Sequence, residues 1–255
     1  MASLFCLFIW SLIVNAIPLS SAFGAGLSSV QNATLSVVHI KSEAGGIVNT
    51  GNQGFIDPQT GRAVILSNLA AVKYERNGVG VIISSLGFIV TNLHTVKDAS
   101  RITVTFHDNQ KKEAALVYEA SGKDIAILRF KPDIFIPAIE FGNSDHLAVG
   151  EELFTIGGSS LTDGAISSGK VIGLSWENAA TKEGVPFVNM IRLHFKLNPY
   201  QGDSGSPLLN QRGEFVGFIA AAQAGTHNPV YALPANVIKK QYLKFLNSRQ
   251  TTTKA

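Results

Sequence analysis

The chain has 255 residues, 45% of them hydrophobic, which is enough apolar material for one large domain or two small cores. Its formal net charge of +3 is small and its basic residues form no stripe, which argues against nucleic acid as a partner. The 24 glycines and 15 phenylalanines, together with many short Val- and Ile-rich runs, favour an all-β fold over a helical bundle.

The N-terminal segment predicts an export signal. An apolar run from Leu4 to Val14 is too short to span a bilayer comfortably, and Ser20-Ser21-Ala22 behind it suits signal-peptidase cleavage. We therefore predict a signal peptide over residues 1–22, a linker over 23–29, a periplasmic or secreted location, and no stable membrane insertion after cleavage. An uncleaved anchor is the alternative, since no lysine or arginine precedes the run. The only cysteine, Cys6, lies in this segment, so the mature chain carries no disulfide.

Short strands are predicted in two groups that turn residues separate. The first group comprises Leu35–Ile40, Val79–Ser84, Phe88–Thr91, Ile102–Phe106, Ala114–Tyr118 and Ile125–Phe130. The second comprises Leu153–Ile156, Gly169–Leu174, Phe187–Leu193, Pro207–Leu209, Phe215–Ala221 and Val230–Leu233. Two such groups indicate two antiparallel β-barrels or sandwiches.

Two further segments complete the pattern. The polar, glycine-rich stretch from Glu43 to Arg62 is predicted as a long loop that is either functional or mobile. Apolar residues at helical spacing predict a helix over residues 235–246 that packs on the second barrel, followed by a frayed polar tail over 247–255.

The stretch QGDSGSPLL places Ser204 between two glycines, just before an apolar run. Glycines in such a loop cost backbone entropy, so the loop is either a plain surface turn or a site that something approaches closely. A serine hydroxyl is a poor nucleophile without a base. The nucleophile interpretation therefore requires a histidine and an acid in comparable positions elsewhere.

Both are present upstream. His94 directly follows the predicted strand that begins with the apolar residues FIV, in the stretch FIVTNL. Asp124 directly precedes the apolar run IAIL, where a partly buried carboxylate needs a hydrogen-bonding partner. In a catalytic triad, Ser204 attacks a carbonyl carbon, His94 transfers the proton, and Asp124 fixes the imidazole tautomer. The backbone N–H groups of Gly202 and Ser204 would then form the oxyanion hole.

Together these motifs resemble the trypsin-like (chymotrypsin-fold) serine proteases, and most of all the protease domain of HtrA/Deg-type proteases. The resemblance covers residues 30–246 and rests on GVGVII at 78–83, TNLHTV around His94, KDIAIL around Asp124 and the stretch 141–157. It implies two six-stranded β-barrels, over about 30–140 and about 146–234, with a C-terminal helix and the triad in the cleft between the barrels. We expect no PDZ domain after the match.

The nucleophile loop departs from the family pattern. Tyr200 and Gln201 look like an insertion, and Asp203 has no evident charged partner in the sequence. The resemblance places Asn198 near the floor of the substrate pocket. It places Ala220, Ala221 and Ala222 along the pocket wall, which favours a small-to-medium apolar side chain before the cut bond.

The predicted function is an exported serine endopeptidase that acts on protein or peptide substrates. The alternative is a latent or inactive protease-fold protein that binds protein or peptide in its cleft. No cofactor and no metal are expected, because no histidines stand at i, i+4 spacing and no cysteine is available. A homotrimer is possible by the resemblance, but no particular residue supports it.

Overall fold

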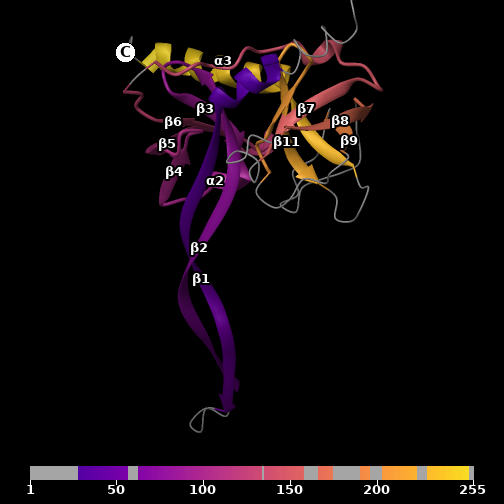
Figure 1. Cartoon of the computed structure of the whole chain (residues 1–255). Helices are drawn as coiled ribbons and strands as arrows, with labels where there is room; N and C mark the ends of the chain where they lie inside the picture. Colours follow the sequence, from indigo (N-terminus) through magenta and orange to yellow (C-terminus); the bar gives the residue numbers. More distant parts are fainter. Residues whose placement is uncertain are drawn as a thin grey trace, which may run out of the picture.

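The computed structural model describes residues 28–56, 63–133, 135–157, 166–174, 190–195, 203–222 and 229–252. Within these residues the strands form two closed antiparallel barrels of six strands each, so the predicted fold class is confirmed. The two barrels lie side by side, with the longest helix across one end of the pair (Figure 1). The predicted signal peptide over residues 1–22 lies outside the described residues.

The first barrel has the strand order β1-β2-β3-β6-β5-β4. Its strands are β1 Val37–Ile56, β2 Ala63–Ser84, β3 Phe88–Asn92, β4 Arg101–Thr105, β5 Lys111–Ala120 and β6 Ile125–Arg129. Burial alternates along β4, whose outer face meets solvent, whereas every residue of β3 is buried. β3 is buried on both faces because one face lines the barrel and the other meets the second barrel.

The second barrel has the strand order β10-β11-β12-β9-β8-β7. Its strands are β7 Glu152–Ile156, β8 Ile166–Gly173, β9 Ile191–Phe195, β10 Pro207–Leu209, β11 Phe215–Ala222 and β12 Val230–Pro234. The described residues also form the short helix α2 Leu93–Val96 and a helical segment at residues 28–33. Three 3-10 turns lie at Thr34–Ser36, Ser121–Lys123 and Ser144–His146.

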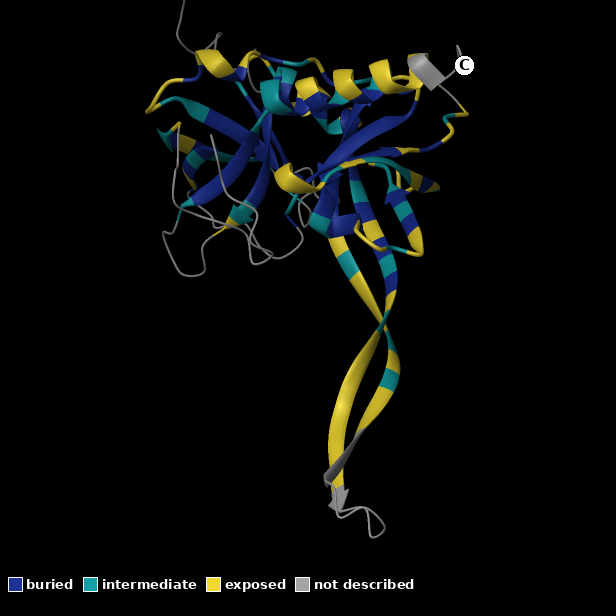
Figure 2. Ribbon diagram, turned by 180° about the vertical axis from the view of Figure 1, so that it is seen from behind, coloured by how far each residue is buried: buried dark blue, intermediate teal, exposed yellow. Residues whose placement is uncertain are grey.

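A shared apolar core joins the two barrels. Val90 and Ile127 of the first barrel belong to the same buried cluster as Phe154 and Phe218 of the second. Each barrel also has its own interior cluster, as the buried strands in Figure 2 indicate. The shared cluster sets how the barrels sit against each other, and therefore how residues carried by different barrels meet.

The predicted loop from Glu43 to Arg62 is wrong for most of its length. Residues 43–56 continue β1 and pair with residues 63–75 of β2 in one long antiparallel hairpin. β4 pairs with β1 only as far as Glu43, so beyond that point the two strands pair only with each other. They leave the barrel as a twisted two-stranded arm that is largely exposed (Figures 1 and 2). Backbone hydrogen bonding to the returning strand, rather than burial on a core, organises this segment.

The C-terminal helix α3, Ala235–Thr252, runs six residues past its predicted end at residue 246. Buried Phe245 contacts the rings of Phe88 and Tyr118, with centroids 5.6 and 5.7 Å away. Both rings belong to the first barrel, so α3 packs on that barrel as well as on the second, where Ile238 joins the shared core. The Arg249 guanidinium lies over Phe245 and extends the contact into the segment predicted as a frayed tail. No helix among the described residues is long and apolar enough to cross a membrane.

Candidate active site

His94 lies on the single-turn helix α2, which starts as soon as β3 leaves the first barrel. Its side chain is 36% exposed, so one edge of the imidazole remains accessible. The strand that precedes it is buried throughout and pairs with both β2 and β6, which gives the histidine a rigid support. The sequence placed His94 at this strand end.

Asp124 lies at the start of β6, next to β3, and is 7% exposed. Its backbone is left-handed, with φ of 52°, a conformation that aspartate tolerates better than most residues. Its Oδ1 accepts a hydrogen bond from the backbone N–H of His94 at 2.9 Å. Its Oδ2 lies 2.8 Å from His94 Nδ1 and also accepts from Asn92 Nδ2 at 2.9 Å. A buried carboxylate is stabilised by such a set of donors.

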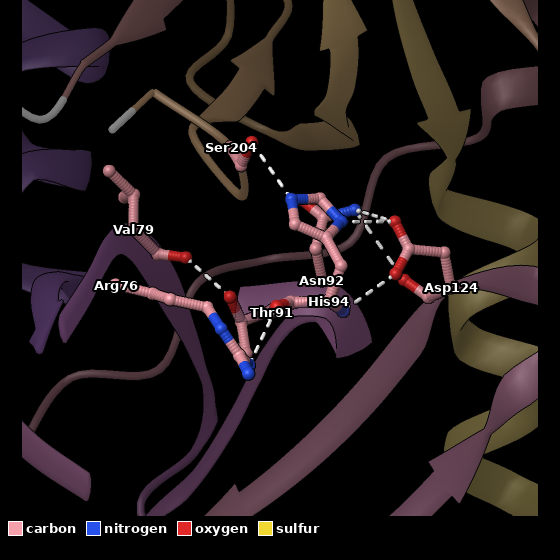
Figure 3. Close-up of polar contacts among 7 residues, drawn as sticks. All are labelled: Arg76, Val79, Thr91, Asn92, His94, Asp124 and Ser204. Carbon is pink, nitrogen blue, oxygen red and sulfur yellow. Dashed lines mark hydrogen bonds and ion pairs between the residues drawn. The ribbon is translucent and has the colours of Figure 1, made fainter. Parts of the chain in front are cut away.

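Ser204 comes from the second barrel, in the turn just before β10, and its Oγ lies 3.2 Å from His94 Nε2. The turn is attached to both barrels. The backbone carbonyl of Ser204 accepts from Val79 N–H of β2 at 2.8 Å, and Gly205 N–H donates to the Ile219 carbonyl of β11 at 2.7 Å. The structure thus brings together three side chains that are 30 and 80 residues apart in the sequence (Figure 3).

This arrangement can move a proton. Since Nδ1 of His94 faces the Asp124 carboxylate, a proton on Nδ1 is hydrogen-bonded there, and Nε2 is free to accept from the Ser204 hydroxyl. Both contacts are within the range of a nucleophile and its general base, allowing for the longer contacts common without substrate. The chemistry available at the site is activation of a serine hydroxyl.

The predicted oxyanion hole and substrate pocket are only partly described. Gly202 and Asn198 lie outside the described residues. Ala220 is 4% exposed and packs in the shared core, Ala221 is half-buried, and Ala222 is exposed at the end of β11. The specificity expected from these residues remains a prediction.

Asp203 precedes the candidate nucleophile and is buried, with 7% exposure. Its carboxylate lies against Gly157 at the end of β7, where a Cβ would be 2.7 Å from Oδ1. Its backbone carbonyl accepts from Ser206 N–H and closes the turn that carries Ser204. Asp203 therefore faces the body of the second barrel.

The sequence did not single out two further residues. Asn92 donates from its side-chain amide to Asp124. The sequence contains a signal for it, because Asn92 stands two residues before His94 at a strand end. Arg76 donates from Nη1 to the backbone carbonyl of His94, and no local pattern marks such a contact. The described part of the chain holds no group of three His, Cys, Asp or Glu side chains that could bind a metal ion.

Comparison with known proteins shows which family the chain resembles. The family model of the trypsin-like peptidase domain matches residues 78–218. A probable periplasmic serine endoprotease DegP-like of Chlamydia trachomatis is 33% identical over 178 residues, which cover 69% of this chain and 35% of that protein. A protein of the same name in Buchnera aphidicola is 32% identical over 207 residues, which cover 76% of this chain and 41% of that protein. The chain thus spans well under half the length of these curated relatives.

A solved structure of the HtrA-type protease AlgW with a decapeptide superposes with a TM-score of 0.63 and covers 83% of this chain and 64% of that one. At 20% sequence identity, this likeness shows the fold. The family match includes His94, Asp124 and Ser204, the three residues that meet between the barrels. The chain belongs to the trypsin-like peptidase domain family, as the resemblance in its motifs predicted.

Proposed function

We propose that this chain is a serine endopeptidase whose catalytic residues are His94, Asp124 and Ser204. The observation that carries the proposal is the continuous chain of contacts from the Asp124 carboxylate through the His94 imidazole to the Ser204 hydroxyl. Serine endoproteases among the similar proteins, by their names, support the same reaction class.

In the proposed reaction, Ser204 Oγ attacks the carbonyl carbon of a peptide bond while His94 Nε2 accepts the hydroxyl proton. The tetrahedral intermediate carries a negative oxygen, which the N–H groups of Gly202 and Ser204 stabilise in our proposal. His94 then gives its proton to the leaving amine, and water hydrolyses the acyl-enzyme by the reverse proton transfers. Asp124 keeps the imidazole in the tautomer that has its proton on Nδ1.

The proposed substrates are proteins or peptides, a class supported by the protease names of the relatives and by the decapeptide in the AlgW structure. For the residue before the cut bond we propose a small-to-medium apolar side chain, from the run of small side chains at Ala220, Ala221 and Ala222. Cleavage of a peptide library and mapping of the cut sites tests this preference. Dominant cleavage after acidic or basic residues would contradict it.

The proposed location is the periplasm or the exterior, on the grounds of the N-terminal pattern and the relatives named periplasmic. N-terminal sequencing of the exported protein should show a start just after Ala22. A homotrimer remains a prediction from the resemblance, and light scattering coupled to gel filtration measures it directly.

A fluorophosphonate probe tests the central proposal because it reacts only with an activated serine. We expect the wild type to be labelled and Ser204→Ala to be unlabelled, whereas Ser206→Ala, which alters a buried neighbouring hydroxyl, keeps the label. His94→Ala should lose the label without change in circular dichroism. His146→Ala, which alters an exposed histidine in the 3-10 turn before β7, should keep it. An unlabelled but folded wild type would favour the latent, peptide-binding alternative.

A further inference from the structure

The one-turn helix that carries His94 is anchored by β3 and Asp124 at its N-terminal end, and its C-terminal end needs hydrogen-bond donors from outside the helix. α2 is one turn long, with Lys97 N–H donating to the Leu93 carbonyl at 2.8 Å. The last carbonyls of a helix have no partner within it and need donors from outside. At α2 these are the carbonyls of His94, Thr95 and Val96, and that of Val96 accepts from Ala99 N–H at 3.2 Å. The carbonyls of His94 and Thr95 remain, and the first belongs to the proposed catalytic histidine itself.

Two side chains at the foot of the β1–β2 arm supply those donors. Arg76 Nη1 donates to the His94 carbonyl at 3.1 Å and to the Lys97 carbonyl at 2.7 Å. Ser42 Oγ, which is buried, donates to the Thr95 carbonyl at 2.5 Å. We call Arg76 and Ser42 the carbonyl clamp. They face each other directly in the β1–β2 register, at the point where the arm leaves the barrel.

The guanidinium of Arg76 is itself fixed. Its Nη2 donates to the hydroxyl of Tyr74 at 3.0 Å, and its Cζ lies 5.0 Å from the centre of the Tyr74 ring. Tyr74 is two residues further out along β2, on the same face of the strand and on the arm itself. A planar guanidinium can serve two carbonyls and a hydroxyl at once, whereas a lysine ammonium is a single point of charge.

The same strand also holds the nucleophile. Three residues after Arg76, Val79 N–H donates to the Ser204 carbonyl at 2.8 Å. β2 therefore contacts the backbone of His94 through a side chain, one of the residues drawn in Figure 3, and the backbone of Ser204 through its own main chain. One strand thus contacts the backbones of both residues whose Nε2 and Oγ lie 3.2 Å apart.

From these contacts, and resting on the proposed function, we infer that Arg76 is a positioning residue for His94, with Ser42 as its partner. The clamp acts through the backbone of α2 and touches no substrate. Its loss should let the imidazole drift from Ser204, and a displacement of about 1 Å at a catalytic group can slow a reaction by as much as about 100-fold. A clamp with only a structural role would lower the melting temperature and leave the rate of the folded protein unchanged.

The test compares Arg76→Ala, Arg76→Lys and Ser42→Ala with Arg101→Ala, which removes a first-barrel arginine whose side chain bonds only the exposed Glu113 among the described residues. We expect fluorophosphonate labelling of Arg76→Ala to be roughly 10- to 100-fold slower than that of the wild type. Arg76→Lys should recover part of the rate and Ser42→Ala should lose several-fold, while Arg101→Ala stays within about twofold. With a peptide substrate, kcat should fall and KM should stay the same. Circular dichroism at the assay temperature confirms that each variant is folded.

A second readout is independent of catalysis. The proton NMR signal of the His94 imidazole N–H bonded to Asp124 should shift or broaden in Arg76→Ala and remain unchanged in Arg101→Ala. Folded Arg76→Ala with wild-type labelling and an unchanged imidazole signal would overturn the inference while leaving the proposed function intact. An unlabelled wild type would overturn the proposed function, and the imidazole signal would then decide on the clamp alone.

Discussion

Gly205 provides a test of how closely the two barrels meet at the nucleophile. Its φ is +88°, and a Cβ at this position would lie 1.9 Å from the backbone carbonyl oxygen of Val79 on the first barrel. In Gly205→Ala the two backbone segments would have to separate by about 1 Å to reach even a tight contact. The left-handed backbone costs about 1 kcal/mol for alanine, and overpacking adds about 1–3 kcal/mol, so we expect a loss of about 2–4 kcal/mol in unfolding free energy.

Gly150→Ala is the matched control, because Gly150 has φ of +91° and its surroundings are open, with nothing within 4 Å of the place that a Cβ would take. It should lose only the backbone contribution of about 1 kcal/mol. Urea unfolding measures both losses, and fluorophosphonate labelling should slow by up to about 100-fold in Gly205→Ala alone, because Ser204 moves with its neighbour. Equal unfolding free energies in the two variants, with wild-type labelling in Gly205→Ala, would refute the close approach of the barrels.

Three further predictions concern the site, the helix and acid stability. Asn92→Ala removes a buried donor to the Asp124 carboxylate, and fluorophosphonate labelling should be about tenfold slower; labelling at the wild-type rate would contradict this role. Phe245→Ala should lower the unfolding free energy by about 3–5 kcal/mol, against about 0.5 kcal/mol or less for Leu243→Ala, which is 50% exposed on the same helix; similar urea midpoints would count against it. Hydrogen bonds from Arg212 and Asn210 lower the pKa of Glu214. The ionised Glu214 carboxylate therefore stabilises the fold above the ordinary glutamate pKa, and this stabilisation is lost as pH falls through the lowered pKa. The melting temperature of the wild type should therefore exceed that of Glu214→Gln at neutral pH. A difference in melting temperature that did not narrow in acid would rule out this linkage.

Local sequence carried most of the information about the barrels. The run that became β3 begins with three apolar residues, and all five of its residues are buried because both faces are covered. β10 begins and ends where it was predicted. The polar run at residues 107–110 forms the turn between β4 and β5, with Asn109 in a left-handed conformation. These features depend on residues near one another in the chain, so a local pattern is enough to find them.

The arm escaped prediction for a physical reason. A strand is read from alternation when one of its faces is buried, and the arm has no core beneath it. Ile47 is 73% exposed and Leu69 is 65% exposed, so apolar residues there carry no information about an interior. The register also shifts between Asn49 and Gly51, where Asn49 Oδ1 accepts from Gly51 N–H, and such a bulge breaks any regular period.

The site also contains residues that local sequence predicts and a contact that it does not. The three residues of the proposed triad are adjacent to recognisable strand ends, and their flanking motifs made them visible in the sequence. Arg76 contacts main-chain carbonyls 18 and 21 residues away, and any sequence at those positions would offer the same carbonyls. Side-chain patterns therefore cannot reveal such a contact, and only the three-dimensional arrangement does.

The position of Val79 explains why the site can span two barrels and still be well defined. His94 belongs to the first barrel and Ser204 to the second, so a slip of the barrels would separate them. Val79 N–H bonds the Ser204 carbonyl, and the Val79 carbonyl accepts from Thr91 Oγ1, a fully buried contact at 2.7 Å on the strand that leads to His94. The missing side chain of Gly205 lets the nucleophile turn approach that carbonyl. The residues around Ser204 therefore join the barrels at the same point where they present the hydroxyl, and alignment of the proposed catalytic pair follows from that contact.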